Sequence, residues 1–364
     1  MKKCSLIVIV LLFYGMMSAV QLQLKERKSL INDSEHFLQL PGGFCLSPDG
    51  THLIVPDIKA GDIKIFSRAS GRLVKVEGRK GVGPNELLMP CKSANDERYL
   101  ALLDMGRRRY FLYEFVKPVG LKRIDEGMPV ELGIDCCFEK DGLVIAAEIY
   151  DKQGKIYDAY RVDLKDKRIK YLLPSEVKYG YASQKEFKAA MQGHDILPIG
   201  IQGYCDVYDG YLYYAWMGNL RIIRVNTVTG EITTFGQKTQ NYIRPQASNR
   251  LASAYAEQDK KLYREERRKL TLIDDINVSK SYIILSYMKH DVGMDRRIRI
   301  LQFYGHDQKL LAEIRSPREI SFFDESDAAS MIVDKKSDRL VYLRRFLNKQ
   351  DEDEYEFLVY DIVK

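Results

Sequence analysis

The sequence has 364 residues, of which 45% are hydrophobic, so the chain is long enough to bury a sizeable core. Its 57 basic and 51 acidic residues leave a net charge of +6, which is spread along the chain and does not call for a nucleic-acid partner. This composition excludes collagen, coiled-coil and multi-span membrane proteins, and the 24 Tyr and 14 Phe residues favour β-strands.

The N-terminus has the layout of a secretory signal peptide. Lys2 and Lys3 precede an apolar run over residues 6–14, and small residues follow before the chain becomes polar. We expect cleavage after Ala19, so that residues 1–19 are a signal peptide and the mature protein is exported to the periplasm or the extracellular space. The alternative is an uncleaved anchor, but the apolar stretch is shorter than the roughly 20 residues of a spanning helix. No stable membrane span is therefore expected after cleavage.

One pattern recurs six times in the rest of the chain: a tight turn, an apolar strand, a variable loop and a second apolar strand. Its copies begin near residues 47, 95, 139, 207, 279 and 335. A short strand precedes each copy, and in five copies another strand follows, which gives four antiparallel strands per repeat. Phe66 and Tyr113 close corresponding strands, and their spacing is close to the roughly 40–50 residues of a propeller blade. Radial packing of such blades buries both faces of each sheet.

The sixth copy ends after its third strand. We therefore expect residues 20–40 to supply the missing strand and close the ring. The prediction is an all-β, six-bladed β-propeller over residues 20–364. Two insertions between blades are expected to be helical, because residues 183–186 form a capping box and apolar residues recur at helical spacing over 251–262.

The chain resembles the six-bladed propellers of the NHL-repeat-like type, which are common among exported bacterial proteins. The run Gly81-Val82-Gly83-Pro84-Asn85-Glu86 is similar to the G-x-G-P-x-E stretch between blades of that family. Asp57 and Asp104 each end a second strand, as in the family, whereas the later copies lack this Asp. The resemblance implies the fold but no function, because this fold hosts many functions. We expect both Asp residues to make strand-end hydrogen bonds rather than to act in catalysis.

Five of the six cysteines lie beyond the signal segment: Cys45, Cys91, Cys136, Cys137 and Cys205. All but Cys136 lie four residues before the Asp or Asn of a first turn, so they occupy one equivalent position on four innermost strands. We expect these four to be buried, reduced and replaceable, because free Cys packs as a small apolar residue. Disulfides, or metal and redox chemistry, are the alternatives.

The long variable links all fall on one face of the predicted propeller, which marks it as the working face. Arginines in the links of the first two blades can bind an anionic group, and we expect the neighbouring G-x-G-P-x-E run to turn toward the mouth of the central channel. Aromatic side chains of the later blades can stack on a sugar or peptide. Solvated loop charges and core packing are the respective alternatives. The candidate ligand-binding residues are Arg79, Asn85, Glu86, Arg107, Arg108, Tyr181 and Trp216.

Two hypotheses for the function are compatible with this fold and these residues. The first is an exported binding or scaffolding propeller, monomeric and without a cofactor, that engages a peptide, glycan or protein partner through its long-loop face and binds no nucleic acid. The alternative is a metal-dependent, lactonase-like hydrolase or lyase that holds a divalent cation on the central axis. The sequence has five His, of which only His194 and His290 fall on the long-loop face, and no spacing singles out a metal-ligand set or a catalytic motif.

Overall fold

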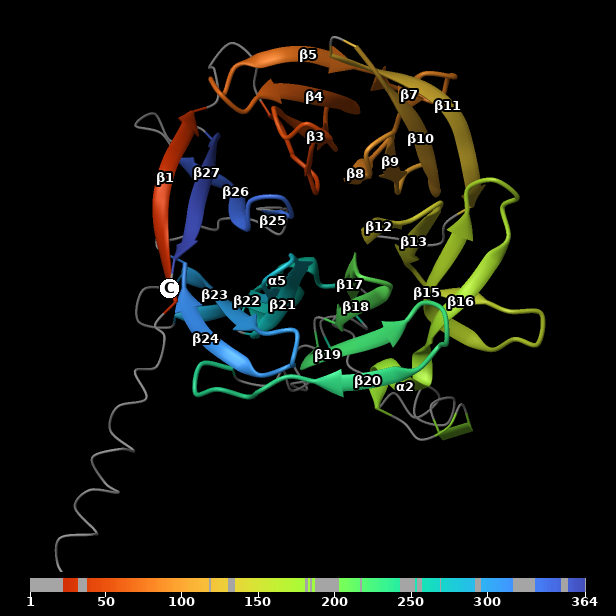
Figure 1. Cartoon of the computed structure of the whole chain (residues 1–364), viewed down its shortest axis with the longest axis vertical. Coiled ribbons are helices and arrows are strands. Elements are labelled where there is room, and N and C mark those ends of the chain that lie inside the picture. Colours follow the sequence, from red (N-terminus) through yellow and green to blue (C-terminus); the bar gives the residue numbers. More distant parts are fainter. Residues whose placement is uncertain are drawn as a thin grey trace, which may run out of the picture.

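The computed structural model describes residues 22–31, 38–117, 119–129, 135–180, 183, 185–186, 203–216, 218–242, 253, 257–268, 270–291, 296–316, 331–347 and 353–363. Six sheets of at least four strands are arranged radially around a common axis (Figure 1). The fold is a six-bladed β-propeller, as the sequence predicts. In the described part of the chain, the helices with defined bounds are the short α2 (Ser175–Tyr179) and α5 (Lys260–Arg268).

Each blade runs from an innermost strand at the axis to an outermost strand at the rim. Blade one contains β2 (Cys45–Leu46), β3 (His52–Asp57), β4 (Asp62–Ser67) and β5 (Leu73–Glu77). Blade two contains β8 (Pro90–Asn95), β9 (Tyr99–Asp104), β10 (Arg109–Val116) and β11 (Gly120–Pro129). Blade three contains β12 (Asp135–Glu139), β13 (Gly142–Ala146), β15 (Ile156–Asp163) and β16 (Ile169–Pro174), with the short β14 (Ile149–Tyr150) also paired to β15.

The second half of the ring repeats this order. Blade four contains β17 (Gly203–Tyr208), β18 (Tyr211–Trp216), β19 (Asn219–Asn226) and β20 (Ile232–Phe235). Blade five contains β21 (Leu272–Val278), β22 (Ile283–Asp291), β23 (Arg296–Tyr304) and β24 (Leu310–Arg315). Blade six contains β25 (Met331–Asp334), β26 (Arg339–Leu347), β27 (Asp353–Val363) and β1 (Gln23–Ile31).

The outermost strand of blade six comes from the other end of the chain. β1 pairs antiparallel with β27, from Gln23 opposite Val363 to Ile31 opposite Glu356, with one bulge between Glu26 and Lys28. Residues near the start of the described chain therefore join the last blade to the first, and the ring closes without a free strand edge at that point.

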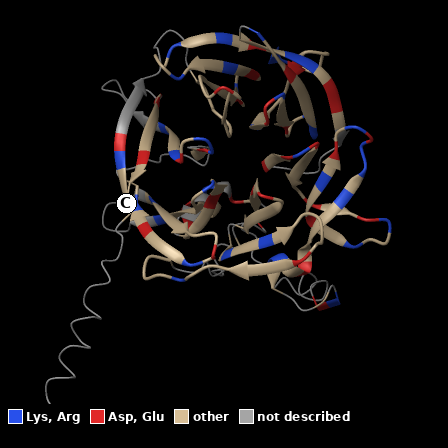
Figure 2. Cartoon of the chain, viewed as in Figure 1, with Lys and Arg blue, Asp and Glu red and all other residues tan. Residues whose placement is uncertain are grey.

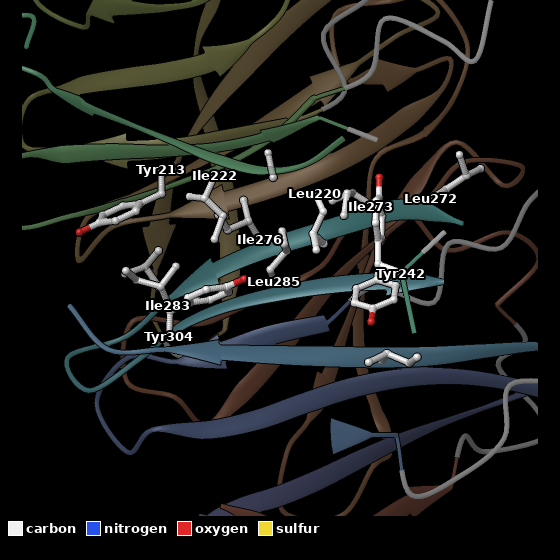
Figure 3. Packing of buried hydrophobic residues seen from close by; sticks show 14 residues of the cluster. Tyr213, Leu220, Ile222, Tyr242, Leu272, Ile273, Ile276, Ile283, Leu285 and Tyr304 are labelled. Atoms are coloured by element: carbon white, nitrogen blue, oxygen red, sulfur yellow. The ribbon is translucent and has the colours of Figure 1, made fainter. Parts of the chain in front are cut away.

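The hydrophobic core lies between the blades. Between blades four and five, for example, Tyr213 and Ile222 pack against Ile276 and Leu285 (Figure 3). The middle strands are buried on both faces, which explains their nearly uninterrupted apolar sequences such as YLALLD and YLYYAW. Each fully buried side chain of this kind contributes about 1.5–3 kcal/mol through removal of apolar surface from water.

Both predicted insertions contain helical residues. In the first, the Ser183 hydroxyl accepts a hydrogen bond from the Glu186 N–H at 3.3 Å, as a capping box requires, and residues 187–200 lie outside the described residues. The unpredicted α2 precedes it and ends at Gly180, whose φ of 82° is left-handed. In the second, α5 covers Lys260–Arg268, and Ser253 is also helical, with its carbonyl oxygen accepting the Glu257 N–H at 2.8 Å. Residues 251–252 and 254–256 lie outside the described residues. No helix in the described part of the chain is long and apolar enough to cross a membrane.

Candidate functional site

Asp57 and Asp104 organise the loops that lead from one blade to the next. The Asp104 carboxylate accepts backbone hydrogen bonds from Leu88, Met89 and Arg107 at 2.8, 2.9 and 3.1 Å. Asp57 plays the same part in blade one, where it accepts the N–H groups of Gln39, Leu40 and Ala60. The expectation that these residues make strand-end hydrogen bonds is confirmed, and the bonds fix the links on the long-loop face of blades one and two.

The G-x-G-P-x-E run folds around its glutamate. β6 (Arg79–Lys80) and β7 (Glu86–Leu87) pair in parallel, and the Glu86 carboxylate accepts hydrogen bonds from the Gly83 N–H at 2.7 Å and from Arg79 Nε at 2.8 Å. Gly81 has a φ of 155°, which residues with a side chain rarely adopt, and a Cβ there would lie 2.1 Å from Glu86 Oε2. The Gly83 hydrogen bond, together with Arg79, holds the pKa of Glu86 below its usual value.

Arg107 holds this loop through hydrogen bonds to its backbone. Its guanidinium donates to the carbonyl oxygens of Gly83 and Glu86 at 3.2 and 3.3 Å and lies 5.1 Å from the centre of the Phe111 ring. The side chain is only 17% exposed, whereas that of Arg79 is 81% exposed. Arg108 follows in a left-handed conformation with φ of 51° and is also exposed. Arg79 and Arg108 are therefore the predicted arginines that solvent and a ligand can reach.

Arg109 and Arg123 complete the group, together with Glu126. Arg109 Nη1 lies 2.7 Å from Glu126 Oε1 and Arg123 Nη2 lies 2.5 Å from Glu126 Oε2, while Arg107 Nη2 is 3.6 Å from Oε1. Arg123 also donates to the Pro84 carbonyl and covers the Phe111 ring at 3.9 Å. We call Arg79, Arg107, Arg108, Arg109 and Arg123 the arginine group. Basic and acidic residues are interspersed around the ring (Figure 2), so this excess of positive charge is local.

The arginine group lies on the outer part of the ring. β7 lies beside β10 and β11, away from the centre (Figure 1). A cavity of about 600 Å³ adjoins it, with Asn85 on one side and the outer strands β5 and β11 on the other. This rim cavity is lined by Lys75, Glu77, Gly78, Asn85, Tyr113, Val116, Lys117, Val119, Gly120, Leu121, Lys122 and Arg123. The expectation that Asn85 and Glu86 face the mouth of the central channel is wrong, because hydrogen bonds to Arg107 and Arg123 hold their loop over blade two.

The predicted aromatic residues lie elsewhere. Trp216 ends β18 and is 8% exposed, with its ring in an edge-on contact with Tyr179 at 4.9 Å. Beside them Lys178 and Asp158 form a buried ion pair at 2.7 Å. Burial lowers the pKa of Lys178 in spite of the Asp158 carboxylate. Trp216 is thus part of the core between blades three and four, and Tyr181 lies outside the described residues.

A second cavity, of about 330 Å³, lies on the axis among the innermost strands. At the inward edges of β17 and β21, carboxylates of the preceding blade accept backbone N–H groups. Asp135 accepts the Cys205 N–H at 2.8 Å, and Asp206 accepts the Val278 N–H at 2.8 Å. Lys92 and Lys335 pair with these carboxylates at 3.0 and 2.6 Å. The sequence analysis missed this ring of charges, because only closure of the propeller brings the groups together.

The buried carboxyl group of Asp275, next to the lining residue Ile276, has a raised pKa. Burial raises the pKa of Asp275 to about 7, against the favourable charge of Lys92. Burial also opposes the charge of Lys92, but Asp135 and Asp275 outweigh it and raise the pKa of this lysine well above its usual value. Lys92 should therefore stay charged at pH 7, whereas Asp275 keeps its proton to a higher pH than an ordinary carboxyl group.

The cysteines line or flank the same channel. Cys45, Cys137 and Cys205 are buried as expected, whereas Cys91 is only half-buried, and the five described cysteines form no disulfide. Burial raises the pKa of Cys45 and of Cys91 to about 12. Among the described residues, no three His, Cys, Asp or Glu side chains are placed to hold a metal ion.

The fold and site thus define a six-bladed β-propeller with a cationic rim and a charged central channel. The sequence matches no protein-family model and no curated protein. Among solved structures, a Bacteroides fragilis protein described as exported has 15% identity and a TM-score of 0.57, over 95% of this chain and 97% of its own. The propeller domain of Cps50 (Swd1) from Myceliophteria thermophila has 11% identity and a TM-score of 0.48, over 94% and 100%. A protein described as a gluconolactonase has 10% identity and a TM-score of 0.48, over 94% and 93%. At 15% identity, the likeness to the Bacteroides fragilis protein shows the fold alone.

Proposed function

We propose that this chain is an exported binding propeller that recognises an anionic group on a peptide, glycan or protein partner through the arginine group. The observation that carries the proposal is the imbalance of charge at this site. Five arginines lie in or beside the links of blades one and two, and among the described residues only Glu86 and Glu126 lie within ion-pair distance of their guanidinium groups.

The geometry of the pairs leaves donors available for a ligand. Each guanidinium has five N–H donors, and three guanidinium groups share the two oxygens of Glu126. The exposed side chains of Arg79 and Arg108 can fold over a carboxylate, sulfate or phosphate, whose geometry matches the guanidinium fork. The guanidinium groups of Arg107 and Arg123 are held in place, because both also donate hydrogen bonds to carbonyl oxygens of the G-x-G-P-x-E loop.

The solvent exposure of the site favours a partner with several anionic groups. An exposed ion pair contributes only about 0–1 kcal/mol, so one isolated charge would bind weakly. A repeating acidic polymer or an acidic protein surface can engage several members of the group and the lysines of the rim cavity together.

Export of this propeller, as a monomer of the NHL-like type, is the second part of the proposal. The signal-peptide layout of residues 1–19 and the likeness of the fold to an exported Bacteroides protein support it. The hydrogen bond from the Gly83 N–H to the Glu86 carboxylate, within the G-x-G-P-x-E run, supports the NHL-like relationship.

Binding to three immobilised polyanions tests the proposal: heparin, polygalacturonate and poly-L-glutamate, with neutral dextran as the reference. The double variant Arg79→Ala/Arg108→Ala should weaken the polyanion bound best by roughly two- to thirtyfold, which corresponds to two exposed ion pairs. The matched control Lys165→Ala/Arg168→Ala removes two exposed cations from a blade-three hairpin and should leave affinity unchanged. Equal losses in both variants, or no loss in the first, would contradict the proposal.

A further inference from the structure

We propose that Cys137 and Cys205 are an oxidisable thiol pair that forms a reversible disulfide between blades three and four. Cys137 lies on β12 and Cys205 on β17, the innermost strands of these two blades. Their Sγ atoms are 3.7 Å apart, across the boundary between the blades. The pair faces the axial cavity and not the arginine group, so this inference is independent of the proposed binding function.

The backbone already holds the two sulfurs opposite each other. Asp135, two residues before Cys137 on β12, accepts the N–H of Cys205 at 2.8 Å and so fixes the offset between the two strands. A disulfide needs a sulfur–sulfur distance of about 2.05 Å. We expect rotation of the two side chains to cover the remaining approach.

The adjacent Cys136 is turned away from this pair. Consecutive residues of a strand point to opposite faces. Cys136 accordingly packs with Ala101 and Leu103 in the core between blades two and three, whereas Cys137 packs with Val207 in the core between blades three and four. The fold therefore selects Cys137, not its neighbour, as the partner of Cys205.

The axial cavity gives a small oxidant access to the pair. Cys137 and Cys205 are 7% and 4% exposed, and both line the cavity of about 330 Å³. At one end its lining residues include the exposed Glu97, Lys335 and Lys336 of the first turns. In this respect the inference rests on the proposed export, because an exported protein meets an oxidising environment in which disulfides persist.

The chemistry balances with a low-molecular-weight disulfide as the oxidant. One cysteine thiolate attacks a sulfur of the reagent, forms a mixed disulfide and expels one thiolate. The second cysteine thiolate then attacks the protein-bound sulfur and expels the other thiolate. The two protons of the cysteine thiols end on the two released thiols, the protein is oxidised by two electrons, and the reagent is reduced by two.

The surroundings of the pair set its rate. The hydrogen bond with Cys137, together with burial, raises the pKa of Cys205 well above that of a free thiol. Because the thiolate is the nucleophile, oxidation should be slow at neutral pH and faster at higher pH. The cross-link would close a chain loop that includes most of blade three, so the Tm should rise on the order of 5 °C.

The test is oxidation of the purified full chain by 2-hydroxyethyl disulfide, followed by alkylation under denaturing conditions and peptide mapping by mass spectrometry. The expected result is the loss of two thiols per chain, one linked pair of peptides that contain Cys137 and Cys205, and full reversal by dithiothreitol. Cys137→Ser and Cys205→Ser should each abolish the linked pair. Cys45→Ser is the matched control, because Cys45 lines the same cavity and is equally buried, and this variant should still form the pair.

Two results would overturn the inference. The first is retention of all thiols in the folded protein under conditions that oxidise the same chain in urea. The second is a linkage that uses Cys136 or Cys45. If a serine variant does not give the circular dichroism spectrum of the parent protein, the corresponding alanine variant replaces it, since alanine fits a buried apolar position better than serine.

Discussion

Replacement of Asp104 by alanine removes one acceptor that serves three backbone N–H groups at 2.8, 2.9 and 3.1 Å. A hydrogen bond to a charged group contributes about 1.5–3 kcal/mol. Leu88 is half-buried and Met89 is exposed, so water can satisfy part of the loss. We therefore expect Asp104→Ala to lower the free energy of unfolding by about 3 kcal/mol.

Urea denaturation, followed by tyrosine fluorescence and circular dichroism, measures this loss. Asp104→Asn keeps one acceptor oxygen and should cost about 1 kcal/mol. The matched control is Asp166→Ala, because Asp166 is exposed and accepts the Arg168 N–H of a surface turn. This control should leave stability nearly unchanged. If Asp104→Ala costs no more than this control, the carboxylate does not organise the link between blades one and two.

Three further predictions concern the loop, the channel and the ring. The pKa of Glu86 is lowered in the folded protein, so its contribution to loop order is present above the unfolded pKa and is lost as the pH falls through the folded pKa. Amide exchange at Gly83 should therefore become faster at acid pH in the parent protein but not in Glu86→Gln. The pKa of Asp275 is raised to about 7, so the folded state binds a proton that the unfolded state releases, and the free energy of unfolding should fall as the pH rises from about 4 to 7. Asp275→Asn should flatten this pH dependence in urea titrations, and an unchanged slope would contradict the prediction. Deletion of residues 22–31 removes β1 and exposes the edge of β27, so the Tm should fall and the protein should self-associate on size-exclusion chromatography. A monomer of unchanged Tm would refute the role of β1 in closing the ring.

The number of blades could be predicted because the physics of the middle strands is simple. A strand buried on both faces must be apolar along its whole length, and six such hairpins stand out in the sequence. The tight turns between them are equally readable: Asp209 and Gly210 both have positive φ, 50° and 75°, as a two-residue hairpin turn needs.

The site was less accessible to sequence reasoning because it depends on register. Arg123 lies opposite Tyr113, and Glu126 opposite Phe111, because β10 and β11 pair with two bulges. The residue pattern of these strands does not predict the bulges. Sequence position alone also could not separate the exposed Arg79 from Arg107, which is occupied by the loop carbonyls. The axial carboxylates were hidden for a similar reason, since Asp135 finds its partner N–H on the next blade.

Amide hydrogen exchange of the full chain, with and without heparin at saturation, tests the central claim most directly because it locates the binding surface. The account predicts slower exchange over residues 78–88, 105–109 and 120–126, the segments that carry the arginine group, and the same segments should lose this protection in Arg79→Ala/Arg108→Ala. Protection confined to other loops or to the first-turn end of the axial cavity, with these three segments unchanged, would contradict the claim that the cationic rim of blades one and two is the site.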